Sequence, residues 1–138
     1  MTPTPSQTVG PFFGVGLLPV NGPDGVRIEG RVLDGAGEPV ADALLEAWHG
    51  DQFARCRTDD EGAFHFTIRS APFLNITVFA RGLLRHLNTR MYFPDSAEDA
   101  VLSLVDPPRR HTLIAKQDRD VLRFDVSLQG EDETVFFA

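Results

Sequence analysis

The sequence lacks the residues that would form disulfides, cysteine-based metal sites or a membrane span. Its single cysteine, Cys56, cannot form an internal disulfide or a multi-cysteine zinc site, so nothing indicates an oxidising compartment. No apolar run approaches the roughly 20 residues that a membrane-spanning helix needs, and the first residues show no basic segment followed by an apolar one. We therefore expect a cytoplasmic protein without a membrane partner.

Basic residues are outnumbered by acidic ones. The chain of 138 residues has 13 Lys and Arg against 20 Asp and Glu, which gives a net charge of −7 at pH 7. A surface of that sign does not favour phosphate backbones, so we expect no nucleic-acid partner. Because 42% of the residues are hydrophobic, the chain can bury the core of one compact domain.

Helical periodicity is almost absent, since only residues 96–104 suggest a short helix. Elsewhere apolar and polar residues alternate, as where Val26, Ile28 and Val32 are interleaved with charged residues. Further strands are predicted at residues 43–48, 64–68, 76–78, 89–93, 112–116 and 122–128. The stretch 49–63 is irregular and ends in a turn signal. Short strands separated by Gly, Asp and Pro turns predict an all-β fold, either an antiparallel sandwich or a barrel.

Residues 1–25 differ from the rest of the chain. They include five prolines and five glycines, which predicts an extended N-terminal arm, and they leave residues 26–138 as a single domain. The arm carries apolar side chains that cost roughly 25 cal/mol per Å² to expose, namely Val9, Phe12, Phe13, Val15, Leu17 and Leu18. The tail, residues 135–137, is apolar too. We expect both ends to form contact surfaces.

Several segments together are specific to one family. They are residues 28–34 with 37–40, residues 43–48 (Ala-Leu-Leu-Glu-Ala-Trp) and residues 57–64 (Arg-Thr-Asp-Asp-Glu-Gly-Ala-Phe), joined by the arm block 4–13 and the block 75–84. In combination they resemble the intradiol ring-cleaving dioxygenases. The resemblance implies a prealbumin-like antiparallel β-sandwich with an N-terminal arm. It also implies an Fe(III) oxidoreductase that opens an aromatic ring between two hydroxyls and incorporates both atoms of dioxygen.

The resemblance further implies that this chain carries no iron. Enzymes of the family hold Fe(III) through two tyrosines and two histidines, and the metal activates a bound catecholate toward dioxygen. The histidine pair corresponds here to Asn75 and Thr77, and the tyrosines would fall in shortened loops where Phe53 and Phe73 are the nearest aromatic residues. The only tyrosine, Tyr92, is expected to be a packed strand residue. We therefore expect no metal ligand and no catalytic residue, with Fe(III) held by an iron-bearing partner chain.

The remaining histidines do not restore a metal site. His49, His65, His86 and His111 show no ligand-like spacing, and His65 is expected on the solvent side of its strand. Cys56 stands between two arginines, which could lower its pKa, but no positioned base indicates a nucleophile. Residues 109–111 are expected to form a solvated loop.

The same resemblance suggests what the chain contributes to a substrate pocket. Thr8, Gly10 and Pro11 match an arm segment that approaches a small aromatic substrate at the subunit interface, where glycine and proline allow close, rigid backbone approach. Arg81 matches an arginine that would pair with a substrate carboxylate, and Arg90 is a weaker candidate. The competing interpretations are a packing arm and a solvated arginine at a strand end, which carry equal weight.

Two other functions stay open at this point. One is a stand-alone prealbumin-like β-sandwich that binds or scaffolds without catalysis, using its apolar arm and tail for association. The other is a self-sufficient metalloenzyme with new ligands. Isolated, the chain is expected to be inactive as a dioxygenase.

Overall fold

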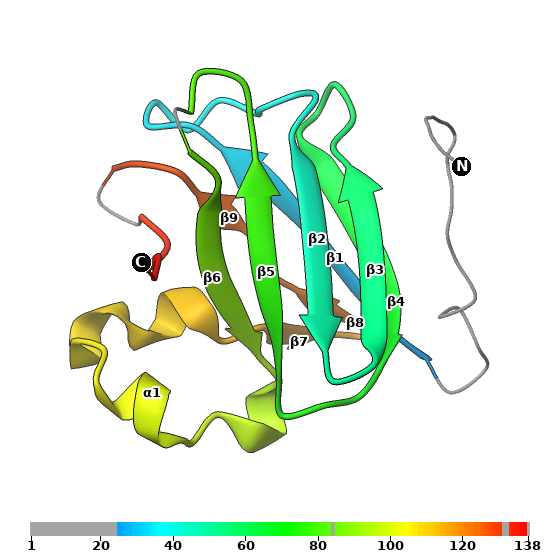
Figure 1. Ribbon diagram of the computed structural model, residues 1–138, viewed down its shortest axis with the longest axis vertical. Helices are drawn as coiled ribbons and strands as arrows, with labels where there is room; N and C mark the ends of the chain where they lie inside the picture. Colours follow the sequence, from blue (N-terminus) through cyan, green and yellow to red (C-terminus); the bar gives the residue numbers. More distant parts are fainter. Residues whose placement is uncertain (1–24, 84, 131–132, 138) are drawn as a thin grey trace.

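The computed structural model describes residues 25–83, 85–130 and 133–137. Predictions for the arm, including those for Thr8, Gly10 and Pro11, concern positions outside the described residues, apart from Gly25, which begins the first strand. In the described part of the chain the strands form two sheets packed face to face (Figure 1). No helix within these ranges is long and apolar enough to cross a membrane.

The first sheet contains the longest strand, β1, at its centre. Its members, in spatial order, are β4 (Ala63–Arg69), β1 (Gly25–Leu33), β8 (Val121–Arg123) and β7 (Lys116–Asp118), with β9 (Val126–Ser127) also pairing with β1. Strand β1 runs antiparallel to β4 but parallel to β8 and β9. The predicted sandwich is therefore confirmed, and the predicted antiparallel pairing holds except at these two short contacts.

The second sheet is antiparallel throughout its described pairs. Its order is β3 (Gln52–Arg57), β2 (Leu44–His49), β5 (Phe73–Phe79) and β6 (Leu87–Tyr92). Strands β2 and β3 are joined by the two residues Gly50 and Asp51, and Gly50 takes a φ of 60°, which a hairpin of this length favours in glycine. We call the face of this sheet that points away from the core the outer face.

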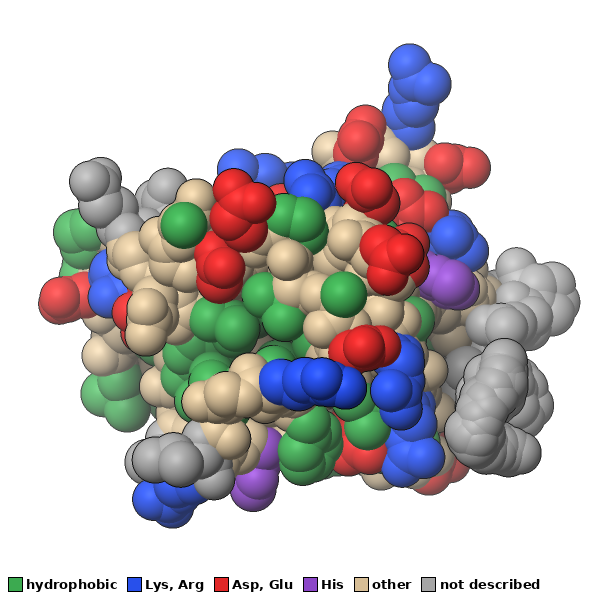
Figure 2. All heavy atoms as spheres, turned by 90° about the horizontal axis from the view of Figure 1, so that it is seen from above, with side chains coloured by type: hydrophobic (Ala, Val, Ile, Leu, Met, Phe, Trp, Pro, Cys, Tyr) green, Lys and Arg blue, Asp and Glu red, His purple; other side chains and the backbone are tan. Residues whose placement is uncertain are grey.

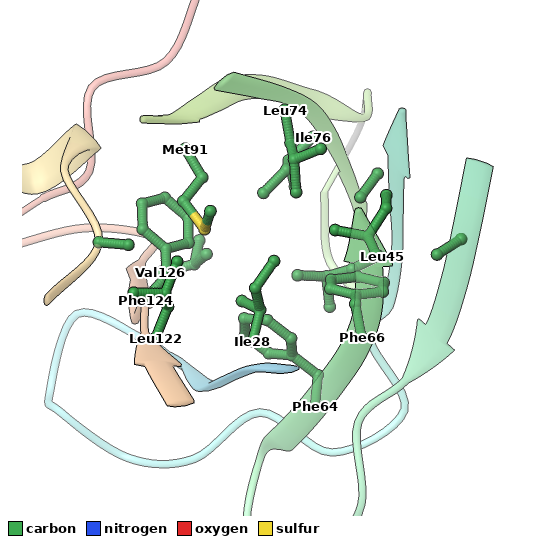
Figure 3. Close-up of a cluster of buried hydrophobic side chains, with 14 of the residues drawn as sticks. Ile28, Leu45, Phe64, Phe66, Leu74, Ile76, Met91, Leu122, Phe124 and Val126 are labelled. Carbon is green, nitrogen blue, oxygen red and sulfur yellow. The ribbon is translucent and has the colours of Figure 1, made fainter. Parts of the chain in front are cut away.

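Alternate residues of both sheets build the core between them. Ile28, Leu45, Phe66, Leu74 and Ile76 are at most 3% exposed, and Figure 3 shows their side chains meeting between the sheets. Their polar neighbours along each strand point outward. The period-two pattern read from the sequence is therefore the pattern of burial.

A helical excursion follows β6 and forms a second apolar cluster. It contains η1 (Pro94–Ser96), α1 (Ala100–Ser103) and η2 (Pro107–Leu113). The buried members of the cluster are Tyr92, Leu102, Val105 and Leu113. Asp99 caps α1, because its carboxylate accepts a hydrogen bond from the Leu102 N–H at 2.8 Å.

The apolar tail is used within the fold. The Phe137 N–H donates to the Asn88 carbonyl at 2.7 Å, which covers part of the free edge of β6. Val135 and Phe137 pack on the second cluster, and Phe136 packs on the main core. The tail thus contributes much of its apolar surface to the chain itself, and the expectation that it forms a separate contact surface is wrong to that extent.

The irregular stretch after β2 contains a strand that the sequence did not reveal. In β3 the inward residues are Gln52, Ala54 and Cys56, while Phe53 and Arg55 point outward. The inward residues of β3 are small or polar, and one of its outward residues is phenylalanine. The hydrophobic pattern of this segment therefore does not indicate which side of the strand is buried. Hydrophobic pattern alone therefore missed β3.

Residues 107–118 also differ from the prediction. Of the strand expected at 112–116, the first two residues belong to η2, which begins at two prolines whose fixed φ suits a helix start. Ile114 forms only an isolated bridge with Tyr92, and β7 begins at Lys116. Nor are Arg109 and Arg110 solvated loop residues. Both are half-buried, and they donate to the backbone carbonyls of Glu133 and of Val105 and Ser103.

The strand expected at 122–128 is interrupted. Its two parts, β8 and β9, keep one register against β1, but the chain between them approaches Gly30 so closely that a Cβ there would lie 1.8 Å from the Phe124 carbonyl oxygen. The Asp125 carboxylate then accepts the Arg31 N–H at 3.0 Å. The Asp125 side chain thus accepts a backbone N–H of β1 that a neighbouring strand would otherwise bind.

Candidate functional site

The two positions where the resemblance places the histidine ligands lie on the outer face, and so do the two phenylalanines nearest to the shortened loops where it places the tyrosines. Phe73, Asn75 and Thr77 are alternate residues of β5, and they point the same way because side chains alternate along a strand. Trp48 on β2 stands between Asn75 and Phe53, in register with both. Positions far apart in the sequence are thus brought onto one surface.

These side chains do not fit Fe(III). Phe53 and Phe73 have no donor atom, and Asn75 and Thr77 offer a neutral amide and a hydroxyl in place of two imidazoles. Thr77 is 6% exposed, and its hydroxyl donates to the Asn88 side-chain oxygen at 3.1 Å. In the part of the chain that the structure describes, no group of three or more His, Cys, Asp or Glu residues could hold a metal ion.

The only phenol of the chain is held in its neutral form. The Tyr92 hydroxyl donates to the Asp99 carboxylate at 2.9 Å and accepts from Arg90 at 3.1 Å. Burial raises the pKa of Tyr92, and the neighbouring Asp99 carboxylate acts in the same direction. Tyr92 is therefore a packed, hydrogen-bonded residue, as expected, and its environment opposes a phenolate.

Asp99 is ionised in this arrangement. Burial alone would raise its pKa, but hydrogen bonds from the Leu102 N–H and the Tyr92 hydroxyl, together with the charge of Arg90, hold the pKa below its usual value. The Arg90 guanidinium lies 3.4 Å from this carboxylate. The trio ties the end of β6 to the start of α1.

Arg90 is engaged on its other side too. Its guanidinium carbon lies 4.0 Å from the centre of the Phe73 ring, which is a cation–π contact. It is the cross-strand neighbour of Asn75, so a positive charge already stands beside a position that the resemblance assigns to a metal ligand. These contacts weaken Arg90 as a candidate for a substrate carboxylate.

Arg81 lies at the other end of the outer face. Strand β5 ends at Phe79, so the alternation that was expected to align Arg81 with Thr77 stops two residues before it. Arg81 is exposed in the connection from β5 to β6, across which the Phe79 and His86 rings lie with their centres 5.5 Å apart. Figure 2 views this end of the sandwich, where charged side chains of both signs surround a group of hydrophobic ones.

The structure separates Cys56 from the arginines beside it in sequence. Cys56 points inward from β3, where burial raises the pKa of its thiol, while Arg55 and Arg57 point outward to Glu46 and Asp42. The expected lowering of the Cys56 pKa is therefore wrong. His65 is exposed, as expected, and loss of hydration with the charge of Arg27 nearby lowers its pKa.

Solved structures share this architecture. The dioxygenase domain of a dioxygenase carbohydrate-binding fusion protein from Streptomyces sp. SirexAA-E has a TM-score of 0.58 at 19% identity, over 90% of this chain and 96% of that one. Hydroxyquinol 1,2-dioxygenase from Pseudomonas putida DLL-E4 also has a TM-score of 0.58, at 21% identity, over 86% of this chain and 63% of the other. The fold is that of the intradiol dioxygenases.

Sequence similarity to two known proteins identifies the chain's family within the intradiol dioxygenases. A protocatechuate 3,4-dioxygenase alpha chain from Burkholderia cepacia is 38% identical over 189 aligned residues, covering 97% of this chain and 96% of the relative. One from Pseudomonas putida is 35% identical over 191, covering 97% and 95%. No protein-family model matches the chain. The chain belongs to the family of protocatechuate 3,4-dioxygenase alpha chains.

This chain is nevertheless shorter than those relatives. The first alignment spans 189 positions, against 138 residues here, so the relative carries residues that this chain lacks. The connections on either side of the outer-face positions are indeed short. Only Gly50 and Asp51 join β2 to β3, and residues 70–72 join β4 to β5.

Proposed function

We propose that the iron of this dioxygenase lies in a partner beta chain, and that this chain, an alpha subunit of an intradiol dioxygenase by family, supplies no metal ligand. The assembled oxidoreductase would open the ring of protocatechuate between its two hydroxyls and incorporate both atoms of dioxygen. The observation that carries this proposal is the outer face itself. It presents Asn75 and Thr77 where the resemblance places the histidines, and its aromatic residues nearest to the shortened tyrosine loops are Phe53 and Phe73, which have no phenolate.

The chain would still contribute to the substrate site across the interface. We assign this role to the arm residues Thr8, Gly10 and Pro11 and to Arg81. The exposure of Arg81 supports the assignment, because a guanidinium free of burial can pair with the carboxylate of protocatechuate. The negative net charge supports the further proposal that neither nucleic acid nor membrane is a partner. A single cysteine, which cannot form an internal disulfide, supports a cytoplasmic setting.

Co-expression with a cognate beta chain tests this function. We expect the two chains to co-purify, iron to accompany the complex, and ring cleavage of protocatechuate to require both chains. Purified alone, this chain should contain no stoichiometric iron and should not cleave the ring. Failure to form a complex, or equal activity of the beta chain alone, would refute the proposal.

A second candidate is a stand-alone sandwich that binds or scaffolds without catalysis. The observation that favours it is the exposure of apolar side chains, with Phe53 at 47%, Phe79 at 39% and Leu104 at 85%. Such patches mark association surfaces. Analytical ultracentrifugation distinguishes the stand-alone sandwich from the alpha subunit. A homo-oligomer that does not bind the beta chain would support the stand-alone sandwich.

A further inference from the structure

We propose that residues 12–20 of the N-terminal arm dock on the outer face, against Trp48 and Phe53. The proposal concerns the free chain and does not depend on a beta chain or on any catalytic role. Three features of the described residues support it: an exposed apolar surface, the place where the arm leaves the sandwich, and the aromatic rings that this surface presents.

The apolar surface lies over β2 and β3. Phe53 is 47% exposed, Trp48 and Leu44 are half-buried, and the Arg55 guanidinium carbon lies 5.5 Å from the centre of the Phe53 ring. Figure 1 shows this side of the sheet without any described segment in front of it. At the β6 side, by contrast, the excursion after β6 packs on Tyr92. Among the described residues, the excursion therefore covers the β6 side of the outer face, and none covers the side nearest β3.

The arm leaves the sandwich next to this surface. Gly25, the first described residue, pairs with Arg69, and the Arg69 N–H donates to the Gln52 side-chain oxygen at 2.8 Å. Gln52 directly precedes Phe53. An extended chain advances roughly 3.3 Å per residue, so a strand of six residues spans about 20 Å and residues 12–24 are long enough to cross the face.

The composition of the arm matches this surface better than the opposite one. The only charged side chain in residues 1–24 is Asp24, and the apolar residues Phe12, Phe13, Leu17 and Leu18 need cover. The solvent face of the other sheet carries Arg27, Glu29 and Arg123, whose charges would lose water under an apolar segment. The outer face carries charges too, since Arg55 pairs with Glu46 there, but beside them it presents the Trp48 and Phe53 rings, against which an apolar segment can pack.

A second exposed apolar surface is less accessible to the arm. It is a shallow depression beside α1 and the tail, lined by residues that include Leu104, Val105, Val135 and Phe137. It lies beyond β6, at the edge of the sheet opposite β3. With residues 12–20 on the outer face, Thr8, Gly10 and Pro11 would extend past the docked stretch and stay available to a partner chain.

The single tryptophan makes the test direct, because Trp48 lies on the surface in question. The full-length chain with Leu17→Asp and Leu18→Asp should show a red-shifted Trp48 emission and a roughly twofold larger acrylamide quenching constant, since the indole face becomes accessible to water. The matched control, Thr4→Asp with Gln7→Asp, adds the same charge outside the apolar stretch and should leave quenching unchanged. Circular dichroism verifies that each variant is folded.

A cross-link gives an independent measurement. In a Cys56→Ala background, Leu18→Cys paired with Phe53→Cys should form an intramolecular disulfide, whereas Leu18→Cys paired with Arg123→Cys on the other sheet should not. The proposal is overturned if the aspartates leave quenching unchanged and the first pair does not cross-link. It is also overturned if shielding of Trp48 rises with protein concentration, which indicates a second copy, or requires the beta chain.

Discussion

At the scale of single residues, the side chains near the outer face divide into committed and available groups. Tyr92, Asp99 and Arg90 satisfy one another and fix the start of the helical excursion. Arg81 lies at the opposite end of β5 and is exposed. Chemistry at this surface must therefore come from residues outside the trio.

The state of Tyr92 can be measured without ambiguity, because it is the only tyrosine. Burial and Asp99 raise its pKa, so the tyrosinate absorbance should appear with a midpoint above the usual tyrosine pKa of 10.0. A raised folded-state pKa stabilises the protein below the unfolded pKa, and that stability is lost as pH rises through the folded one. Tyr92→Phe should abolish this absorbance change and lower the free energy of unfolding at neutral pH by about 1–2 kcal/mol. A titration at or below 10 would contradict the geometry.

Arg81 is tested by comparison with Arg85, which is exposed in the same connection. In a complex with the beta chain, Arg81→Ala should raise the KM for protocatechuate about tenfold and change kcat less, because a contact to the substrate carboxylate is lost. Arg85→Ala should leave both constants near the wild-type values. Equal effects of the two substitutions would indicate general charge steering, and no effect of either would remove Arg81 from the pocket.

At the scale of the elements, the two sheets are fastened along one edge by side chains. The Gln52 amide donates to the Arg69 carbonyl at 3.2 Å and accepts its N–H at 2.8 Å, and the Cys56 sulfur accepts the His65 N–H at 3.4 Å. Backbone groups of β4 that face this edge are thereby satisfied by β3.

Removal of the Gln52 amide should therefore be costly. Gln52→Ala leaves the Arg69 N–H and carbonyl without these partners and should lower the free energy of unfolding in urea by about 2–3 kcal/mol. Gln129→Ala, at an exposed position, should change it by less than about 0.5 kcal/mol. If the two variants unfold alike, Gln52 does not fasten the edge.

The junction between β8 and β9 depends on a missing side chain. A Cβ at Gly30 would lie 1.8 Å from the Phe124 carbonyl oxygen, so Gly30→Ala must displace that backbone and should destabilise the fold by about 2–3 kcal/mol. Gly35→Ala meets only the Gln129 side chain and serves as the control. Thermal unfolding of both proteins decides the matter, and a Gly30 variant as stable as the control would show that the contact can relax.

At the scale of the whole molecule, the chain keeps the sandwich of an oxygen-activating family and lacks its donor set. The fold can be kept while the metal ligands are lost, because the core is built from inward residues. Asn75 and Thr77, which the resemblance aligns with the histidine ligands, point outward from β5. Replacement of outward residues changes the chemistry without removing core contacts.

Restoring only the histidines should not restore an iron site. The isolated chain with Asn75→His and Thr77→His should stay folded but show no visible tyrosinate-to-iron absorption with added Fe(III), because Phe53 and Phe73 supply no phenolate and Tyr92 is held neutral. Optical titration with ferric iron, with the wild-type chain alongside, measures this. A coloured one-to-one complex would show that the phenolate positions are placed incorrectly.

Much of the fold was predictable from the sequence, since alternation of apolar residues is imposed by burying one side of a strand. It located the central strands, such as residues 26–32 and 64–68, and the motifs identified the family. The hydrophobic pattern did not predict β3, which buries small or polar residues such as Gln52 and Cys56. These side chains point inward because they bind backbone groups of β4.

The sequence by itself determined that this chain has one tyrosine and no His-x-His pair, so it does not contain the two tyrosines and two histidines that the resemblance implies for the family's iron. Only the tertiary structure decided where those positions meet. Phe53, Asn75 and Thr77 share one face because β3 and β5 flank β2. The pKa of Tyr92 is raised because the fold buries its hydroxyl beside the Asp99 carboxylate. Residue types are readable from the sequence, whereas the proximity of residues on different strands and the burial that shifts a pKa depend on tertiary packing.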